Sequence, residues 1–210
     1  VWTGQEVVIT QGGATPLVAA FDPASFTWRT IPIPKDIVST WPHEGGSYDP
    51  GWQTMIGDTM AVMFGKGSGV SLPASMLLLD PATGNWTQTT VPPTLAPFHL
   101  VASSTQLFVV ESGDVDTTTG CLGATQLHTY DLASDSWTET QLPNGNWQPA
   151  LAVWEGDRLL LAGGFQCGSS QPVRAAALFD PTTDTWSEIA SLPLDGEGVA
   201  TPAAVTDTMV

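Results

Sequence analysis

The stretch "FDPASFTW" at residues 21–28 has three relatives further along the chain: "LDPATGNW" at 79–86, "YDLASDSW" at 130–137 and "FDPTTDTW" at 179–186. In each copy a tryptophan stands six residues after an aspartate. An aspartate carboxylate accepts hydrogen bonds from backbone N–H groups about two residues further on, and a following proline presets φ at about −65° for a turn. The stretch therefore predicts one kind of turn between two strands, used four times.

The spacing of these turns predicts a repeated structural unit. The four aspartates, Asp22, Asp80, Asp131 and Asp180, are 58, 51 and 49 residues apart, and repeats of about 50 residues are typical of arrays of similar units. Short apolar strands and tight turns fill each interval, and no segment has a sustained helical period, so we expect essentially no helix. The units are expected at approximately 1–34, 50–92, 97–143 and 148–193, with the start of another at 199–210.

Each repeated tryptophan begins the outer strand of its unit. A flat, wide ring at that place covers the gap between two neighbouring sheets. We therefore expect these four indoles to be packing residues; the alternative is that they form platforms for a ligand. They are Trp28, Trp86, Trp137 and Trp186.

The pattern resembles kelch repeats. A pair of glycines ends the second strand, at Gly12–Gly13 and Gly163–Gly164, before the aromatic-Asp-Pro turn and the tryptophan. The resemblance implies an all-β fold, a kelch-like β-propeller of four-stranded antiparallel blades. Because the chain carries four units and the beginning of a fifth, we expect a partial propeller; the alternative is a ring of four blades closed by the C-terminal strand. Propellers serve enzymes, binding modules and scaffolds, so the resemblance does not imply one activity.

The longer connections follow the second and fourth strands of each unit and should emerge on one face. Loops on a rigid scaffold tend to carry function, and exposed rings beside polar groups suit the apolar side chains of a protein or a sugar ring. We expect a binding or structural module that engages a protein partner, or the remaining blades of a longer chain, through this face. A glycan is the alternative ligand, and bracing of the loops is the alternative role of the rings. The candidate contacts are Trp41, His43, Tyr48, Phe98, Trp147 and Phe165.

Motifs for catalysis and for cofactors are weak. The three histidines have no ligand-like spacing, and His128 is expected at the surface of its strand. Part of a propeller enzyme, such as a galactose-oxidase-like protein, stays open as an alternative, but the sequence favours no catalytic residue and no cofactor. One acidic loop has oxygen ligands at alternate positions that suit calcium, at Glu111, Asp114 and Asp116, although a solvated turn explains it as well.

The two cysteines, Cys121 and Cys167, fall in the same connection of adjacent units. We expect them to form a disulfide, with two free thiols as the alternative; a bridge implies an oxidising compartment. The expected location is therefore extracellular, at the cell surface or periplasmic.

The charge of the chain restricts its partners. Five basic against 21 acidic residues give a formal net charge of −16, which repels the phosphates of nucleic acids. No apolar run reaches the length of about 18 residues that a membrane span needs. We therefore expect neither nucleic acid nor a membrane span among the interactions of this protein.

Overall fold

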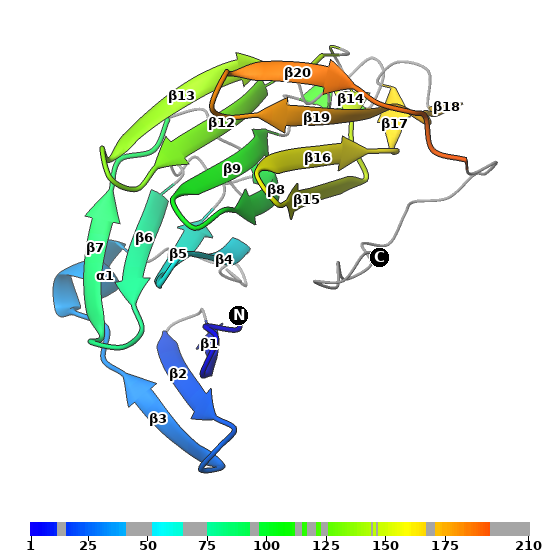
Figure 1. Cartoon of the computed structure of the whole chain (residues 1–210). Coiled ribbons are helices and arrows are strands. Elements are labelled where there is room, and N and C mark those ends of the chain that lie inside the picture. The colour runs from blue at the N-terminus through cyan, green and yellow to red at the C-terminus, as the bar shows by residue number, and fades with distance from the viewer. Residues whose placement is uncertain are drawn as a thin grey trace. The chain divides into compact units, whose positions relative to one another are not determined.

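The computed structural model describes residues 1–11, 16–40, 52–64, 75–92, 97–111, 115–116, 121–122, 126–143, 145, 147–166 and 171–193 (Figure 1). These residues form antiparallel sheets that follow one another along the chain. We call the four main sheets blades 1 to 4. Residues 199–210, where the start of another unit is expected, lie outside the described part.

Blade 1 contains β1 (Val7–Gln11), β2 (Leu17–Asp22) and β3 (Thr27–Ile31), in that order. Residues before β1 pair back onto its edge, because Val1 and Val8 exchange backbone hydrogen bonds and Trp2 bridges Val7. Blade 2 contains β4 (Trp52–Ile56), β5 (Thr59–Phe64), β6 (Ser75–Asp80) and β7 (Asn85–Thr89), also in chain order.

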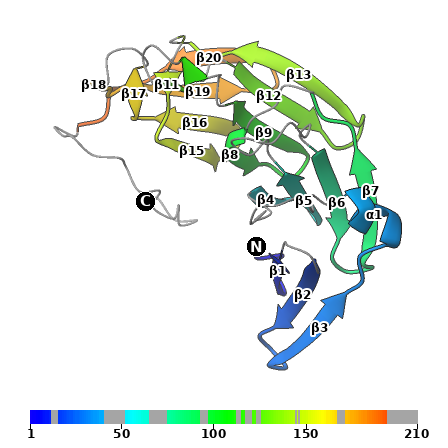
Figure 2. The same cartoon turned by 180° about the vertical axis from the view of Figure 1, so that it is seen from behind.

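Blade 3 has the order β13-β12-β9-β8, with β8 (Pro97–Ala102), β9 (Gln106–Glu111), β12 (Gln126–Asp131) and β13 (Ser136–Gln141). Blade 4 contains β15 (Leu151–Glu155), β16 (Arg158–Ala162), β19 (Ala176–Asp180) and β20 (Thr185–Glu188), which Figure 2 shows from behind. Three of the four main sheets are four-stranded and their strands alternate in direction along the chain, so the predicted all-β fold of four-stranded antiparallel blades is confirmed.

Short ribbons form in the connections at one end of blades 3 and 4. The strands β10 (Val115–Asp116) and β11 (Cys121–Leu122) pair between β9 and β12. A small sheet has the order β14-β17-β18, with β14 (Trp147–Gln148), β17 (Phe165–Gln166) and β18 (Gln171–Pro172). Both cartoon views place β17 and β18 beyond the ends of β16 and β19 (Figures 1 and 2).

One helix departs from the expectation of essentially no helix. The helix α1 (Lys35–Thr40) has six residues and joins blade 1 to blade 2. Pro34 stands directly before it and Asp36 lies in its first turn, both of which favour a helix N-terminus. Its residue Ile37 is 6% exposed and joins the core, but two adjacent apolar residues, Ile37 and Val38, give no helical period to read in the sequence.

The chain forms two compact units: Val1–Pro97, Ala102–Leu107 and Tyr130–Trp137 make the first, and Phe98–Val101, Phe108–Thr129 and Thr138–Val210 make the second. In the first unit, one face of blade 1 and one face of blade 2 form a shared core of apolar side chains. Its buried members are Val8, Val18, Ala20, Ile31, Ile37, Met60, Val62, Leu77 and Leu79.

The second unit has a core of the same construction, between one face of blade 3 and one face of blade 4. Its buried members are Phe108, Val110, Leu127, Leu142, Trp147, Leu159, Leu161, Ala177 and Phe179. In both cores the strands contribute alternate residues, as expected for half-buried sheet faces.

Candidate functional site

The repeated aspartates close the turns that the sequence predicts. Asp22 Oδ1 accepts a hydrogen bond from the Ala24 N–H at 2.7 Å, and its Oδ2 accepts one from Ser25 Oγ at 2.7 Å. Asp80, Asp131 and Asp180 accept equivalent bonds from residues two or three positions further on. Hydrogen bonds from a serine or threonine hydroxyl and from backbone N–H groups hold the pKa of Asp22, Asp80 and Asp131 below its ordinary value.

The fifth residue of every turn adopts a left-handed backbone conformation. Phe26, Gly84, Asp135 and Asp184 have φ of 57°, 74°, 48° and 53°. Glycine adopts this conformation without steric cost, and aspartate adopts it more readily than most residues. Phe26 gives no sequence signal for the conformation, and sequence reasoning missed the shared position.

Two of the four repeated tryptophans connect their blade to the segment that follows the preceding outer strand. Trp86 Nε1 donates to the Pro32 carbonyl at 3.0 Å, and Trp137 Nε1 donates to the Thr90 carbonyl at 2.7 Å. Each acceptor lies four residues after the tryptophan of its own blade. Trp186 is half-buried and packs against the core of the second unit, whereas Trp28 is 58% exposed.

A second contact recurs where consecutive blades meet. Thr89 Oγ1 donates to Asp135 Oδ1, and Thr140 Oγ1 donates to Asp184 Oδ1 at 2.6 Å. At the corresponding place a Cβ on Gly84 would lie 3.6 Å from Ile31 Cγ2. In all three cases the fifth turn residue of one blade meets a residue of the preceding blade, which stands three positions after that blade's tryptophan. We call these two positions the junction pair: the fifth turn residue is its first position, and the residue three positions after the tryptophan is its second.

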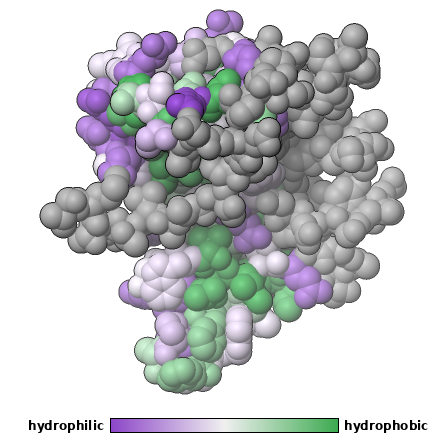
Figure 3. Space-filling model, turned by 90° about the vertical axis from the view of Figure 1, so that its right-hand side faces the viewer, coloured by the Kyte–Doolittle hydropathy of each residue, from purple (hydrophilic) through white to green (hydrophobic). Residues whose placement is uncertain are grey.

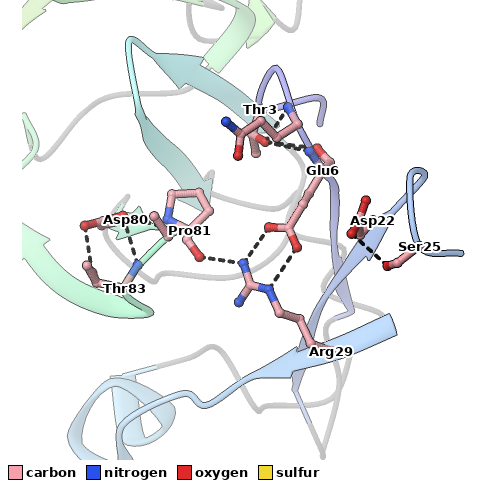
Figure 4. A network of polar contacts seen from close by, with 10 residues as sticks. Thr3, Glu6, Asp22, Ser25, Arg29, Asp80, Pro81 and Thr83 are labelled. Carbon is pink, nitrogen blue, oxygen red and sulfur yellow. Dashed lines mark hydrogen bonds and ion pairs between the residues drawn. The ribbon is translucent and has the colours of Figure 1, made fainter. Parts of the chain in front are cut away.

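An arginine adds a polar contact between blades 1 and 2 (Figure 4). Arg29 on β3 binds Glu6 through Nε at 2.9 Å and through Nη2 at 2.6 Å, and Nη2 also donates to the Pro81 carbonyl at 2.7 Å. The hydrogen bond from Arg29 lowers the pKa of Glu6. These contacts hold the turn of blade 2 against blade 1, so the turn end of the blades is occupied by structural interactions.

The opposite end of blades 3 and 4 carries the ribbons. Trp147 in β14 is 0% exposed, and its Nε1 donates to the Gly163 carbonyl at 2.7 Å. We expected Trp147 to present an exposed ring, and this expectation is corrected: the indole is a core residue that fixes the ribbon to blade 4, because its large apolar ring is buried while its N–H finds a carbonyl.

The glycine pair of blade 4 provides the close approach that this ribbon needs. A Cβ on Gly164 would lie 1.9 Å from the Gln148 carbonyl oxygen and 2.7 Å from the Ala150 nitrogen. Gly164 also has φ of 90°. The strand β17 begins at the next residue, so Phe165 is held, half-buried, in the ribbon opposite Gln148.

The remaining candidate contacts are not brought together by the described part of the chain. Trp41, His43 and Tyr48 lie outside the described residues, as do Asp114 and Cys167. Phe98, Asp116 and Cys121 lie in β8, β10 and β11, where the structure describes the backbone. The disulfide and the calcium ligands therefore stay predictions, and among the described residues no group of three His, Cys, Asp or Glu side chains is placed to hold a metal ion.

His128 lies in the interior of its blade, and the expectation of a surface position is wrong. Its exposure is 0%, its Nε2 donates to Glu111 Oε2 at 2.9 Å, and its Nδ1 lies 3.5 Å from Glu139 Oε1. It stands three residues before Asp131, where the other blades carry Ala19, Leu77 and Ala177. A polar residue at a core position needs partners, and Glu111 on a neighbouring strand supplies one for Nε2, whereas Nδ1 makes no hydrogen bond within the described part of the chain.

His99 has a structural contact as well. Its Nε2 lies 2.8 Å from the Pro149 carbonyl, and burial lowers the pKa of the imidazole. The contact joins β8 to the segment before β15, next to the ribbon. No helix among the described residues is long and apolar enough to cross a membrane.

Comparison with known proteins identifies the fold class. No protein-family model matches the chain, and no curated protein matches it in sequence. Solved structures do match, among them one titled "Structure of YjhT", with a TM-score of 0.54 and 15% sequence identity over 84% of this chain. The match spans 60% of the YjhT chain. At this identity the likeness shows the fold alone: the protein has the all-β fold of a β-propeller, built from four-stranded antiparallel blades.

Proposed function

We propose that this chain is a non-catalytic binding or structural module that engages a protein partner through the ribbon end of its blades. We further propose that its repeats are of the kelch type, which the aspartate-to-tryptophan spacing and the Gly163–Gly164 pair support.

The observation that carries the proposal is the unequal use of the two blade ends. The aspartate turns are short, and their polar groups are engaged by their own turns, by neighbouring blades and by Arg29. At the other end the longer connections build the ribbons, which Trp147 and His99 fix to the blades. Binding residues are typically carried on loops that a rigid scaffold positions.

A partner-binding experiment tests the proposal. Proteins that co-purify with the chain from its source are compared for the parent, for the double variant Trp41→Ala/Phe165→Ala, which changes two candidate contacts, one of them in the ribbon strand β17, and for the control Thr182→Ala in an aspartate turn. A partner held by the parent and the control, lost by the double variant and then bound in purified form is the expected result. A partner that the double variant binds equally well contradicts the proposal, and binding to a glycan array without any protein partner favours the carbohydrate alternative.

We also propose that the protein is exported and that Cys121 and Cys167 form a disulfide. Their place in equivalent connections of adjacent units and the near absence of lysine, with Lys35 and Lys66 alone, support this. The intact mass after alkylation, with and without a reductant, measures the bridge. Labelling of both thiols in the absence of reductant contradicts it.

A further inference from the structure

One face of blade 1 is apolar and exposed, although the equivalent face of blade 2 is buried. Val7 and Ile9 are 36% and 46% exposed, while Met60 and Val62, at the equivalent positions of blade 2, are both 0% exposed. Leu17 on the same face is 42% exposed. Figure 3 shows hydrophobic surface at its lower end, where Figure 1 draws β1 to β3.

The residues that join blades elsewhere are present on this face and exposed. Trp28 is 58% exposed, whereas its equivalents Trp86 and Trp137 donate to carbonyls of a preceding blade. Phe26 occupies the fifth turn position and is 79% exposed, whereas Asp135 and Asp184 at that position accept hydrogen bonds from a preceding blade. This face therefore carries one complete half of a blade junction.

Blade 4 carries the other half. Ile189 stands three residues after Trp186 and therefore occupies the second position of the junction pair. Its side chain is 39% exposed. Ile31, at the same position in blade 1, is 2% exposed. Leu160 and Leu178 of blade 4 are half-buried, while Val8 and Ala20 at the equivalent positions of blade 1 are 0% exposed.

The residues at the two open faces match each other in polarity. The junction pairs within the chain combine like with like: Thr89 and Thr140, which are polar, meet aspartates, and the apolar Ile31 meets Gly84. Phe26 is large and apolar, so its partner at the second position should be apolar, and Ile189 is apolar. Trp86 and Trp137 each donate to the carbonyl four residues after the tryptophan of the preceding blade. Trp28 needs an equivalent carbonyl, and in blade 4 the one four residues after Trp186 belongs to the exposed Ala190.

We propose that the exposed face of blade 1 binds blade 4 of a second copy of this chain, with Phe26 against Ile189 and the Trp28 indole donating to the Ala190 carbonyl. The contact joins two different surfaces, so two copies can close a ring with two such contacts or extend into a longer series. It uses sheet faces and not the ribbon end, so it is independent of the proposed function.

Sedimentation velocity of the full chain and of two variants tests this contact. The parent should form species of two or more chains, with masses at least twice the 22.1 kDa of a single chain. Trp28→Glu and Ile189→Glu should each be monomeric alone, because each loses one half of the junction. The control Thr182→Glu, which adds the same charge in an exposed turn, should associate like the parent.

Mixing the two monomeric variants distinguishes this contact from other modes of association. Trp28→Glu retains an intact blade 4, and Ile189→Glu retains an intact blade 1, so an equimolar mixture should form a heterodimer with one junction. A parent chain that is monomeric at every concentration overturns the proposal, and so does a mixture that stays monomeric while both variants keep the circular dichroism spectrum of the parent.

Discussion

At the scale of single residues, the left-handed glycines fall into two kinds. Gly156 has φ of 61°, and a Cβ added to it would have no other atom within 4 Å, so conformation alone requires glycine there. Gly164 has φ of 90° and also lacks room, since a Cβ would meet the backbone of Gln148 and Ala150. The first is a requirement of a tight turn, and the second is a requirement of the ribbon that passes over blade 4.

These two positions give a matched pair of substitutions. Gly156→Ala should lower the free energy of unfolding by about 1–2 kcal/mol, which is the usual cost of a left-handed conformation for an L-residue. Gly164→Ala should cost clearly more, because β14 must also move away from β17. Urea denaturation followed by tryptophan fluorescence measures both variants, and equal costs would contradict the steric role assigned to Gly164.

A second prediction at this scale concerns the carboxylate of Asp135. Hydrogen bonds from Thr89 and Tyr130 lower the pKa of this group below its ordinary value of 3.8. A group whose pKa is lower in the folded state stabilises the fold above its unfolded pKa, and this contribution is lost as the pH falls through the folded pKa. Burial and the bond to Asp135 also raise the pKa of Tyr130 to about 12, so the phenol remains a donor at neutral pH.

Asp135→Asn should therefore destabilise the protein at pH 6, and the difference from the parent should shrink as the pH falls below about 4. The free energy of unfolding in urea, measured from pH 6 downwards, gives the comparison. Asp157→Asn, which removes an exposed carboxylate in another turn, is the control. A difference that is constant across this range would show that the charge of Asp135 has no role in the contact.

At the scale of the strand and its turn, the junction pair links one blade to the next. Thr89 is 6% exposed, whereas Thr140 is exposed to a greater extent, so the hydrogen bond to Asp135 is better shielded from water than the bond to Asp184. Hydrogen bonds to charged groups are stronger where water competes less.

Double-mutant cycles should reveal this difference. The cycle of Thr89→Val with Asp135→Ala should give a larger coupling energy than the cycle of Thr140→Val with Asp184→Ala. Both cycles are measured as free energies of unfolding under one buffer condition, so that long-range charge effects are shared. Coupling that is equal, or larger for the exposed pair, would contradict the importance of shielding.

The sequence predicted the strands and turns well, and the reason lies in their local chemistry. An aspartate that binds its own turn can be recognised from a local sequence pattern, and so can a strand that alternates in polarity. Each pattern extends over about ten residues. The junction pair could not be predicted in this way, because Asp135 and Thr89 are 46 positions apart and neither is unusual alone. Trp147 and His128 were misplaced for a related reason: burial depends on carbonyls and carboxylates supplied by distant segments, such as Gly163 and Glu111.

At the scale of the whole molecule, the dominant property is charge. The formal net charge is −16 with only five basic residues, of which Arg29 is engaged with Glu6. Like charges at this density oppose compaction, and dissolved salt screens them over about 10 Å at 0.1 M.

We therefore expect the melting temperature at pH 7 to rise by several degrees between about 10 mM and about 0.5 M sodium chloride, because screening relieves the repulsion. Differential scanning calorimetry measures the shift. The variant Asp157→Lys/Glu188→Lys, which replaces two exposed negative charges by positive ones, should show a smaller shift. A melting temperature that falls with salt would mean that attractive ion pairs outweigh the repulsion.

The junction pair has a consequence for exchanging blades between positions in the chain. Each blade brings its own fifth turn residue, but the side chain that this residue meets belongs to the blade before it. Moving blade 3 so that it follows blade 1 would set the Asp135 carboxylate against the Ile31 side chain, where it would meet no hydroxyl. To exchange blades and keep these contacts, each repeat must be cut after its fifth turn residue and before the residue three positions after its tryptophan. Each exchanged segment then contains both members of one junction pair.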